Sequence, residues 1–210
     1  MTDIDLVLWD IGQVLYQSPF ERFDELEAHT GIPAGTLPRG PFGTEPDPSY
    51  DAVDSGERDE PEYWRDIEGL AQQSVPGLHI YDALRELGWD GRGRPVVLGL
   101  LADIASRYRQ AVLTNDATKF LGEGWRDTWE YAGYFERIVD SLDIGVRKPH
   151  AGAFTAAVEL LDVDPARVLF VDDLEVNVQG ARDAGLQGFR FETTDPAGSV
   201  AGVRALLGLD

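Results

Sequence analysis

Short apolar runs recur along the chain, and each of them ends in a polar or acidic residue. Within a run the apolar positions are consecutive and do not alternate with polar ones, which is typical of strands buried on both faces. Helical patterns lie between the later runs, as expected for a parallel sheet whose crossovers are helices. The sequence therefore predicts an α/β fold with a doubly wound parallel sheet. The five expected strands cover residues 5–10, 111–116, 137–141, 168–173 and 188–192.

Three segments between the later strands carry the spacing of amphipathic helices. In residues 95–108 the apolar side chains recur three or four positions apart, behind a proline suited to a helix start. Residues 153–161 repeat this pattern, and residues 177–185 end on a glycine that is placed to cap a helix. We expect these helices to cover the sheet.

The stretch between the first and second expected strands is too long for a simple crossover. It has helical patterns of its own, at residues 20–29, 62–73 and 78–87. A segment rich in Pro and Gly, residues 32–48, separates the first two of these patterns and is expected to be irregular. We therefore expect a small α-helical cap domain at residues 17–93, inserted into a core domain made of residues 1–16 and 94–210.

The charge balance limits the partners that the protein can have. The chain has 38 acidic and 18 basic residues, a net charge of −20. A field of that sign repels nucleic acid and anionic membranes, because affinity for them depends on Lys and Arg side chains that neutralise phosphates. Residues 45–68 hold ten acids against two arginines, which is most simply a solvated face. A small molecule is the expected partner.

The 210 residues include no cysteine, which excludes disulfides, thiolate metal sites and a cysteine nucleophile. No apolar stretch approaches the roughly 18 residues that a membrane-spanning helix needs. The chain begins MTDIDLVLWD, with no basic segment before the apolar run, which predicts a first strand and not a signal peptide. We expect a cytoplasmic protein, and its oligomeric state stays open.

Polar residues suited to a phosphate group follow the expected strands. In a parallel α/β sheet, ligands bind outside the carboxyl ends of the strands, so these side chains are expected to share one crevice. Carboxylates can hold Mg²⁺, a lysine offsets phosphoryl charge, and a carboxylate can attack phosphorus. The set consists of a candidate nucleophile, two hydrogen-bonding side chains, one cation and an acidic pair: Asp10, Thr114, Asn115, Lys148, Asp172 and Asp173.

These residues, in this order, resemble the haloacid dehalogenase (HAD) superfamily of hydrolases. The segments that carry the resemblance are WDIGQVLY (9–16), VLTND (112–116), RKP (147–149) and VDDLEVNVQGARDAG (171–185). The inserted helices look like the cap that many members carry after the first motif. Within the superfamily, the D-x-G form of the first motif, together with the paired acids of the fourth, is similar to a phosphatase subgroup that includes glucose-1-phosphate phosphatase.

The resemblance implies a nucleophile and a metal site. Asp10 would attack phosphorus and form an aspartyl-phosphate. The Asp10 carboxylate, the backbone carbonyl of Gly12 and Asp172 would bind Mg²⁺, the implied cofactor. Asp173 and Asn177 would support the metal through water, although Asn177 stands where many members carry an aspartate.

The resemblance also implies a phosphate-binding set. Thr114 and the backbone of Asn115 would hold the phosphoryl oxygens, and Lys148 would bridge the nucleophile and the phosphate. Each residue has an ordinary structural alternative, because acids and threonines after strands often cap the next segment and a lysine can simply be solvated. Four motifs in the right order favour the functional interpretation. The histidines match no metal or triad spacing: they are His29, His79 and His150.

One expected catalytic group is missing from the first motif. Most phosphatases of the superfamily carry an aspartate two residues after the nucleophile, and here that residue is Gly12. General acid–base help of this kind is typically worth about 10²–10⁴ in rate. The substrate could have a leaving group that needs little protonation, such as an anomeric sugar phosphate or an acyl phosphate. Alternatively, Tyr16, His150, a cap residue or ordered water could take over, or the protein is not a competent phosphatase.

We expect a Mg²⁺-dependent phosphomonoester hydrolase that acts on a small phosphorylated metabolite, with a sugar phosphate as the preferred class. Two alternatives stay open: a non-catalytic protein that binds a phosphorylated ligand or a partner, and a metal-independent hydrolase of the dehalogenase type. The presence of Asp10 and Lys148 argues against the first, because only chemistry requires both. The pair Asp172 and Asp173 argues against the second, because the fourth motif of the dehalogenase branch builds no Mg²⁺ site.

Overall fold

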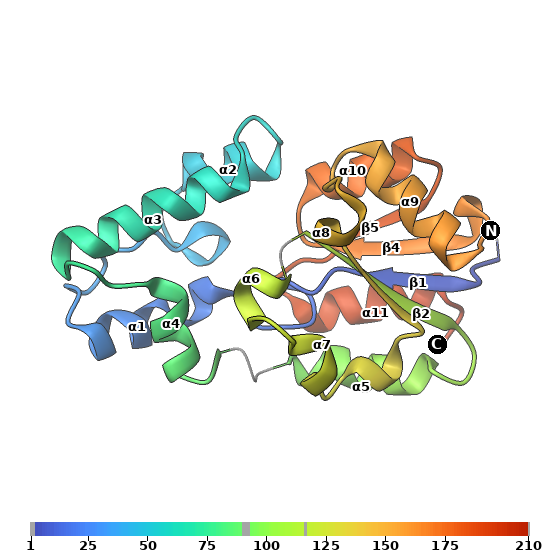
Figure 1. Ribbon diagram of the computed structural model, residues 1–210, viewed down its shortest axis with the longest axis horizontal. Coiled ribbons are helices and arrows are strands. Elements are labelled where there is room, and N and C mark those ends of the chain that lie inside the picture. The colour runs from blue at the N-terminus through green and yellow to red at the C-terminus, as the bar shows by residue number, and fades with distance from the viewer. Residues whose placement is uncertain (1–2, 90–92, 116, 210) are drawn as a thin grey trace. The chain divides into compact units, whose positions relative to one another are not determined.

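The computed structural model describes residues 3–89, 93–115 and 117–209. The chain divides into two compact units, one made of Met1–Tyr16 with Gly93–Asp210 and the other of Gln17–Arg92. We call the first the sheet unit and the second the helical unit (Figure 1).

The sheet unit contains a five-stranded parallel sheet in the order β3-β2-β1-β4-β5 (Figure 1). The chain starts at the central strand, winds to one edge and then winds to the other, so the predicted doubly wound arrangement is confirmed. All five expected strands are present, with ends that lie within two residues of the expected ones. They are β1 (Leu6–Trp9), β2 (Arg109–Thr114), β3 (Arg137–Asp140), β4 (Val168–Asp172) and β5 (Gln187–Arg190). Asp116, the last residue of the second expected strand, lies outside the described residues.

Helices cover both faces of the sheet (Figure 1). On β1, Leu6 and Leu8 pack with α9 and α10, whereas Val7 and Trp9 pack with α5 and α11. All four residues of β1 are fully buried, which explains why this strand is an uninterrupted apolar run in the sequence. The covering helices are α5 (Pro95–Ile104), α9 (Ala151–Leu161), α10 (Glu175–Asp183) and α11 (Pro196–Leu206).

The sequence predicted α5, α9 and α10 but not the other helices of the sheet unit. α10 is followed by Gly185 in a left-handed conformation, as expected of a glycine after a helix. The shortest helices have four or five residues, too few for a periodic pattern: α6 (Ala117–Leu121), α7 (Trp125–Thr128) and α8 (Ser141–Ile144). Two single turns, η4 (Ala132–Tyr134) and η5 (Pro165–Arg167), complete this unit. Across the described residues, no helix is long and apolar enough to cross a membrane.

In the described part of the helical unit, the regular elements are all helices, joined by irregular segments. The helices expected at residues 20–29, 62–73 and 78–87 are confirmed as α1, α3 and α4, except that residues 20–22 belong to a 3₁₀ turn. α2 was not predicted, and it begins where the Asp47 carboxylate accepts hydrogen bonds from the first backbone amides. The elements are η1 (Pro19–Arg22), α1 (Phe23–Thr30), η2 (Gly40–Phe42), α2 (Pro48–Asp54), α3 (Glu60–Ser74) and α4 (Ile80–Glu86).

Aromatic side chains form the core of the helical unit. The Phe20 ring lies between 5.2 and 6.1 Å, centroid to centroid, from the rings of Phe23, Tyr50, Tyr63 and Trp64. All five side chains are buried. These aromatic residues therefore pack the unit itself, as side chains of this size usually do in a small helical fold.

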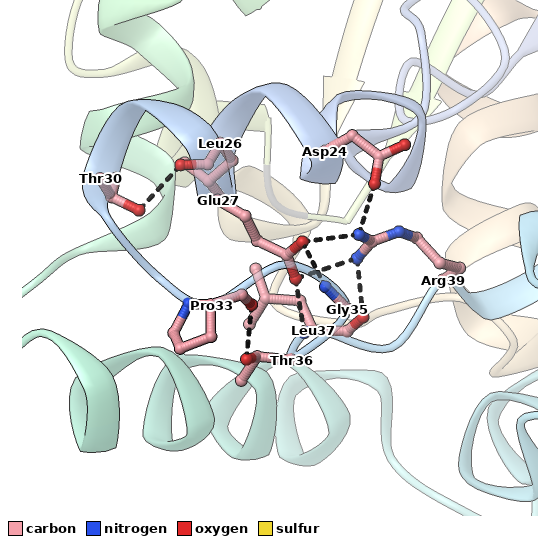
Figure 2. A network of polar contacts seen from close by, with 9 residues as sticks. All are labelled: Asp24, Leu26, Glu27, Thr30, Pro33, Gly35, Thr36, Leu37 and Arg39. Atoms are coloured by element: carbon pink, nitrogen blue, oxygen red, sulfur yellow. Dashed lines mark hydrogen bonds and ion pairs between the residues drawn. The ribbon is translucent and has the colours of Figure 1, made fainter.

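The Pro- and Gly-rich segment is irregular, as predicted, but one buried carboxylate holds its backbone (Figure 2). Glu27, on α1, accepts hydrogen bonds from the backbone amides of Gly35 and Leu37, both at 2.8 Å. It also forms an ion pair of 2.8 Å with Arg39, whose guanidinium reaches Asp24 as well. Burial raises the pKa of Glu27, but Arg39 and the two amides outweigh it, so the pKa lies below its ordinary value of 4.5.

We expect Glu27→Gln to lower the free energy of unfolding at pH 7 by about 2 kcal/mol, because it removes a buried charged acceptor from these donors. The folded-state pKa of Glu27 is depressed, so its stabilisation is complete above pH 4.5 and is lost as the pH falls through the folded-state value. The difference between variant and wild type, measured by urea unfolding, should therefore shrink at pH 3.

Glu86→Gln is the matched control, because this glutamate is 70% exposed and its ion-pair partner within the described residues is His29. An exposed pair contributes about 0–1 kcal/mol. Equal losses in the two variants would contradict the role of Glu27.

Candidate active site

A buried lysine lies between two carboxylates at the carboxyl ends of neighbouring strands. Lys148 Nζ donates to Asp10 Oδ1 at 2.7 Å and to Asp172 Oδ2 at 2.6 Å. Asp10 follows β1, and Asp172 ends β4, which pairs with β1. Thr114 is 4% exposed and ends β2, the strand on the other side of β1. The topology thus brings together the acids and the lysine that the sequence placed in one crevice.

The backbone of Lys148 is held by the side chain of Asn115. Asn115 Nδ2 donates to the Lys148 carbonyl at 3.0 Å, and Asn115 Oδ1 accepts from the Lys148 amide at 2.9 Å. Next to the lysine, the carbonyl of Pro149 lies so close to Gly180 of α10 that a side chain at Gly180 would overlap it. The sequence indicated a role for the Asn115 backbone. The supporting role of its side chain was missed, because it depends on a contact between residues 33 positions apart.

Asp172 has a structural role as well as its contact with the lysine. Its Oδ1 accepts a hydrogen bond of 3.0 Å from the backbone amide of Leu174, which leads into α10. Asn177 Nδ2 donates to the two Asp172 oxygens at 3.0 and 3.2 Å. Asn177 therefore contacts Asp172 directly, whereas the resemblance implied support through water. The first turn of α10 fixes the direction of the Asp172 carboxylate.

The acids at this edge of the sheet could hold a metal ion. Asp10, Asp172 and Asp173 are all buried, and each offers a carboxylate oxygen within 4.8 Å of the others. Opposite oxygen ligands of Mg²⁺ lie roughly 4 Å apart, since each Mg–O distance is about 2.0–2.1 Å. Hard oxygen donors of this kind suit Mg²⁺. The residues present therefore fit the cofactor that the resemblance implied.

The three charges in contact perturb one another. Burial, and after it the neighbouring Asp172 carboxylate, raise the pKa of Asp10 to about 7, while the Lys148 ammonium opposes this rise. Burial by itself would lower the pKa of Lys148, but Asp10 and Asp172 outweigh it and the pKa lies above its ordinary value. Lys148 is therefore a permanent cation at neutral pH. Further positive charge at the site would favour the ionised form of Asp10.

A tight loop follows the candidate nucleophile. The Gly12 carbonyl accepts a hydrogen bond of 2.5 Å from the Val14 amide, and Gln13 has a φ of 53°, in the left-handed region. A carbonyl oxygen has two lone pairs, so this bond is compatible with the predicted metal contact of Gly12. Arg94 Nε donates to the Gln13 carbonyl at 3.1 Å. No sequence pattern singled out Arg94.

The two named substitutes for the missing acid have other contacts. Tyr16 is 3% exposed, and its hydroxyl accepts a hydrogen bond of 2.5 Å from Trp129 Nε1 within the core of the sheet unit. His150 is exposed, and its Nδ1 accepts a hydrogen bond of 3.0 Å from the Gly152 amide at the start of α9. Both contacts are structural, so the geometry favours neither side chain as the general acid.

The fold and the acidic cluster define an α/β protein with a candidate divalent-metal site. Its sequence matches the haloacid dehalogenase-like hydrolases over residues 4–185, which include every site residue discussed above. The chain belongs to this family of hydrolases. The resemblance found in the four motifs is thereby confirmed, and the glucose-1-phosphate phosphatase subgroup stays a proposal.

Solved structures with the same fold resemble the chain at low sequence identity. YfnB from Bacillus subtilis, bound to magnesium, matches with a TM-score of 0.62 and 16% identity over 88% of this chain and 85% of that chain. A HAD family enzyme from Bacteroides thetaiotaomicron, in complex with magnesium and inorganic phosphate, matches with a TM-score of 0.51 and 21% identity over 90% and 95%. Identities this low support the shared fold only.

Among curated proteins, Acyl-CoA dehydrogenase family member 10 from Mus musculus is 27% identical to the chain over 207 residues. That segment is 96% of this chain but 19% of the mouse protein. A second curated relative is matched over 34% of its length. The chain thus spans a minor part of these relatives.

We expect Mg²⁺ to raise the melting temperature of the wild-type protein and to leave Asp172→Asn unchanged. A ligand at about 100 times its dissociation constant stabilises the folded state by about 2.7 kcal/mol. Binding requires ionised carboxylates, so the shift should be larger at pH 8 than at pH 6, on either side of the pKa of about 7 of Asp10. Differential scanning fluorimetry measures it.

Asp103→Asn is the control for charge alone, because Asp103 is 60% exposed and pairs with Arg204 on the surface. This variant should keep the full shift. If Mg²⁺ stabilised Asp172→Asn as strongly as the wild type, the cluster would not be the metal site.

Proposed function

We propose that the chain is a Mg²⁺-dependent phosphomonoester hydrolase that works through an aspartyl-phosphate on Asp10. The observation that carries the proposal is the Lys148 ammonium held between the Asp10 and Asp172 carboxylates, at the carboxyl edge of the sheet. A buried lysine in contact with the nucleophile can neutralise the charge of an incoming phosphoryl group. The magnesium and phosphate complexes of solved family members support the same chemistry.

In the proposed reaction an Asp10 carboxylate oxygen attacks phosphorus, and the bond from phosphorus to the leaving oxygen breaks. Water then attacks the aspartyl-phosphate, which releases inorganic phosphate and regenerates the carboxylate. Lys148 stabilises the negative charge on both the nucleophile and the phosphoryl oxygens, and Thr114 and the Asn115 backbone orient those oxygens. Asp10, the Gly12 carbonyl and Asp172 would hold the metal, which when bound offsets phosphoryl charge.

The missing acid defines the preferred substrate class. With glycine at position 12, the leaving oxygen receives no proton from the place where most related phosphatases supply one. Rates are then highest for leaving groups that depart with little protonation, and among metabolites the anomeric sugar phosphates have this property. We assign substrate selection to residues 17–93, the proposed cap, because the helices inserted there look like the cap that many family members carry after the first motif. A small phosphorylated metabolite, in a cytoplasmic setting, remains the proposed context.

We expect Mg²⁺-dependent hydrolysis of p-nitrophenyl phosphate and of sugar phosphates, abolished by EDTA. Asp10→Asn should reduce kcat by at least about 10³-fold, because it removes the nucleophile. Asp103→Asn, on the surface, should match the wild type. Activity that persists in EDTA would favour a metal-independent hydrolase, and Mg²⁺ binding without turnover on any substrate would favour a binding protein.

The structure leaves room for an acid at position 12. A Cβ added to Gly12 would have Asp10 Oδ2 as its nearest neighbour, at 3.6 Å, which is an ordinary contact. Gly12 is not among the described residues with positive φ, so a side chain is not strained there. A carboxyl group beside Asp10 would have its pKa raised by the like charge, as a general acid requires.

We therefore expect Gly12→Asp to raise kcat on alkyl phosphates by up to about 10²–10⁴-fold, and to change kcat on p-nitrophenyl phosphate far less. Gly12→Asn is the matched control, because asparagine has nearly the same size as aspartate but has no acidic proton to give to the leaving oxygen. An equal gain in both variants would show an effect on binding. No gain on alkyl phosphates in Gly12→Asp would show that the leaving group is already protonated from elsewhere.

A further inference from the structure

We infer that Arg94 is a positioning residue, which holds the loop after Asp10 in the geometry that the nucleophile and the Gly12 carbonyl need. The consequence for catalysis rests on the proposed function. The contacts themselves do not, because they lie within the sheet unit and involve the loop, Arg94 and the end of the sheet.

Arg94 binds the loop at two of its carbonyl oxygens. Its side-chain Nε donates to the Gln13 carbonyl at 3.1 Å, and its backbone amide donates to the Leu15 carbonyl at 2.7 Å. Gln13 is one of two non-glycine residues with positive φ in the described part of the chain. A left-handed conformation is unfavourable for such a residue, so the surrounding contacts must maintain it. The Arg94 guanidinium supplies one of them.

On its other side the guanidinium lies over the ring of Phe191, 5.9 Å from the ring centroid. The Phe191 amide donates to the Asp172 carbonyl at 2.8 Å. Arg94 therefore lies between the loop that follows Asp10 and Phe191, whose backbone is hydrogen-bonded to that of Asp172. The two segments carry Asp10 and Asp172, whose carboxylates both accept a hydrogen bond from Lys148. Movement of the loop would therefore change the distance between these two carboxylates.

The burial of Arg94 indicates that its charged group makes a specific interaction and does not only fill space in the core. The residue is 4% exposed, and a buried guanidinium costs free energy that an apolar side chain of similar volume would not. The backbone of Arg94 also accepts from the Val97 and Leu98 amides at the start of α5. A substitution of the side chain leaves these backbone bonds possible, so it tests the guanidinium separately.

The test compares Arg94→Met with the wild type by amide hydrogen exchange, by Mg²⁺ and phosphate affinity, and by steady-state kinetics. We expect exchange at the amides of Val14, Leu15 and Tyr16 to rise by about 10–100-fold, which corresponds to the loss of one charge-assisted hydrogen bond. We expect Mg²⁺ affinity and kcat to fall by about tenfold or more, with little change in KM. If Arg94→Met does not fold, Arg94→Lys carries the same test, because it keeps the charge and the stem but not the fixed position of Nε.

Two controls separate positioning from stability. Val97→Ala truncates a fully buried side chain on α5, the helix that begins directly after Arg94, and Arg204→Met removes an arginine from the surface. Val97→Ala should lower the melting temperature without a selective rise in exchange at residues 14–16, and Arg204→Met should change neither. The inference is overturned if loop exchange in the Arg94 variant equals that of the wild type, or if Val97→Ala raises it equally.

The hydrogen-exchange result does not depend on the proposed activity. If the wild-type protein hydrolyses no phosphate ester, the proposed function fails, and the exchange and Mg²⁺ measurements still decide the role of Arg94. If the wild type is active and the Arg94 variant keeps the kcat and loop exchange of the wild type, the proposed function stands and the positioning role fails.

Discussion

The ammonium of Lys148, held between the Asp10 and Asp172 carboxylates, is the interaction on which the sheet edge depends. Each of these charges would be costly to bury alone, and removal of one member leaves its partners uncompensated. Their side chains are between 0% and 11% exposed, so solvent compensates little of that cost. The supporting contacts therefore serve to keep the Lys148 ammonium within hydrogen-bond distance of one carboxylate oxygen of Asp10 and one of Asp172.

The order of the strands makes this cluster possible. Asp10 and Lys148 are 138 positions apart in the sequence, and they meet because β1 pairs with β2, and Asn115, which follows β2, holds the Lys148 backbone. The carboxyl ends of these strands lie at one edge, so polar residues that follow them converge there. Asn115 then fixes the lysine backbone, and the first turn of α10 fixes Asp172. Support for the site thus comes from residues whose own positions are set by the sheet.

The absence of an acid at position 12 affects the chemistry more than the structure. The loop keeps its tight turn through the Gly12 carbonyl, and the Lys148 ammonium contacts the Asp10 and Asp172 carboxylates without any side chain at position 12. A site of this composition can hold a metal, a nucleophile and a phosphoryl group, while the proton for the leaving oxygen has to come from the substrate, solvent or another group. The leaving group therefore becomes the property on which the proposed substrate class depends.

The sequence by itself determined the five strands, their parallel doubly wound arrangement, most of the longer helices and the residues of the acidic cluster. These features were predictable because an uninterrupted apolar run is typical of a strand buried on both faces of the sheet. The residue that ends such a run then lies at the carboxyl edge of the sheet. Other features were decided only by the tertiary structure: the short helices α6 to α8, the contact of Asn115 with the lysine backbone, the burial of Tyr16 and the position of Arg94. The short helices have too few residues to show a period. The other three features depend on contacts between residues far apart in the chain, and local periodicity carries no information about such contacts.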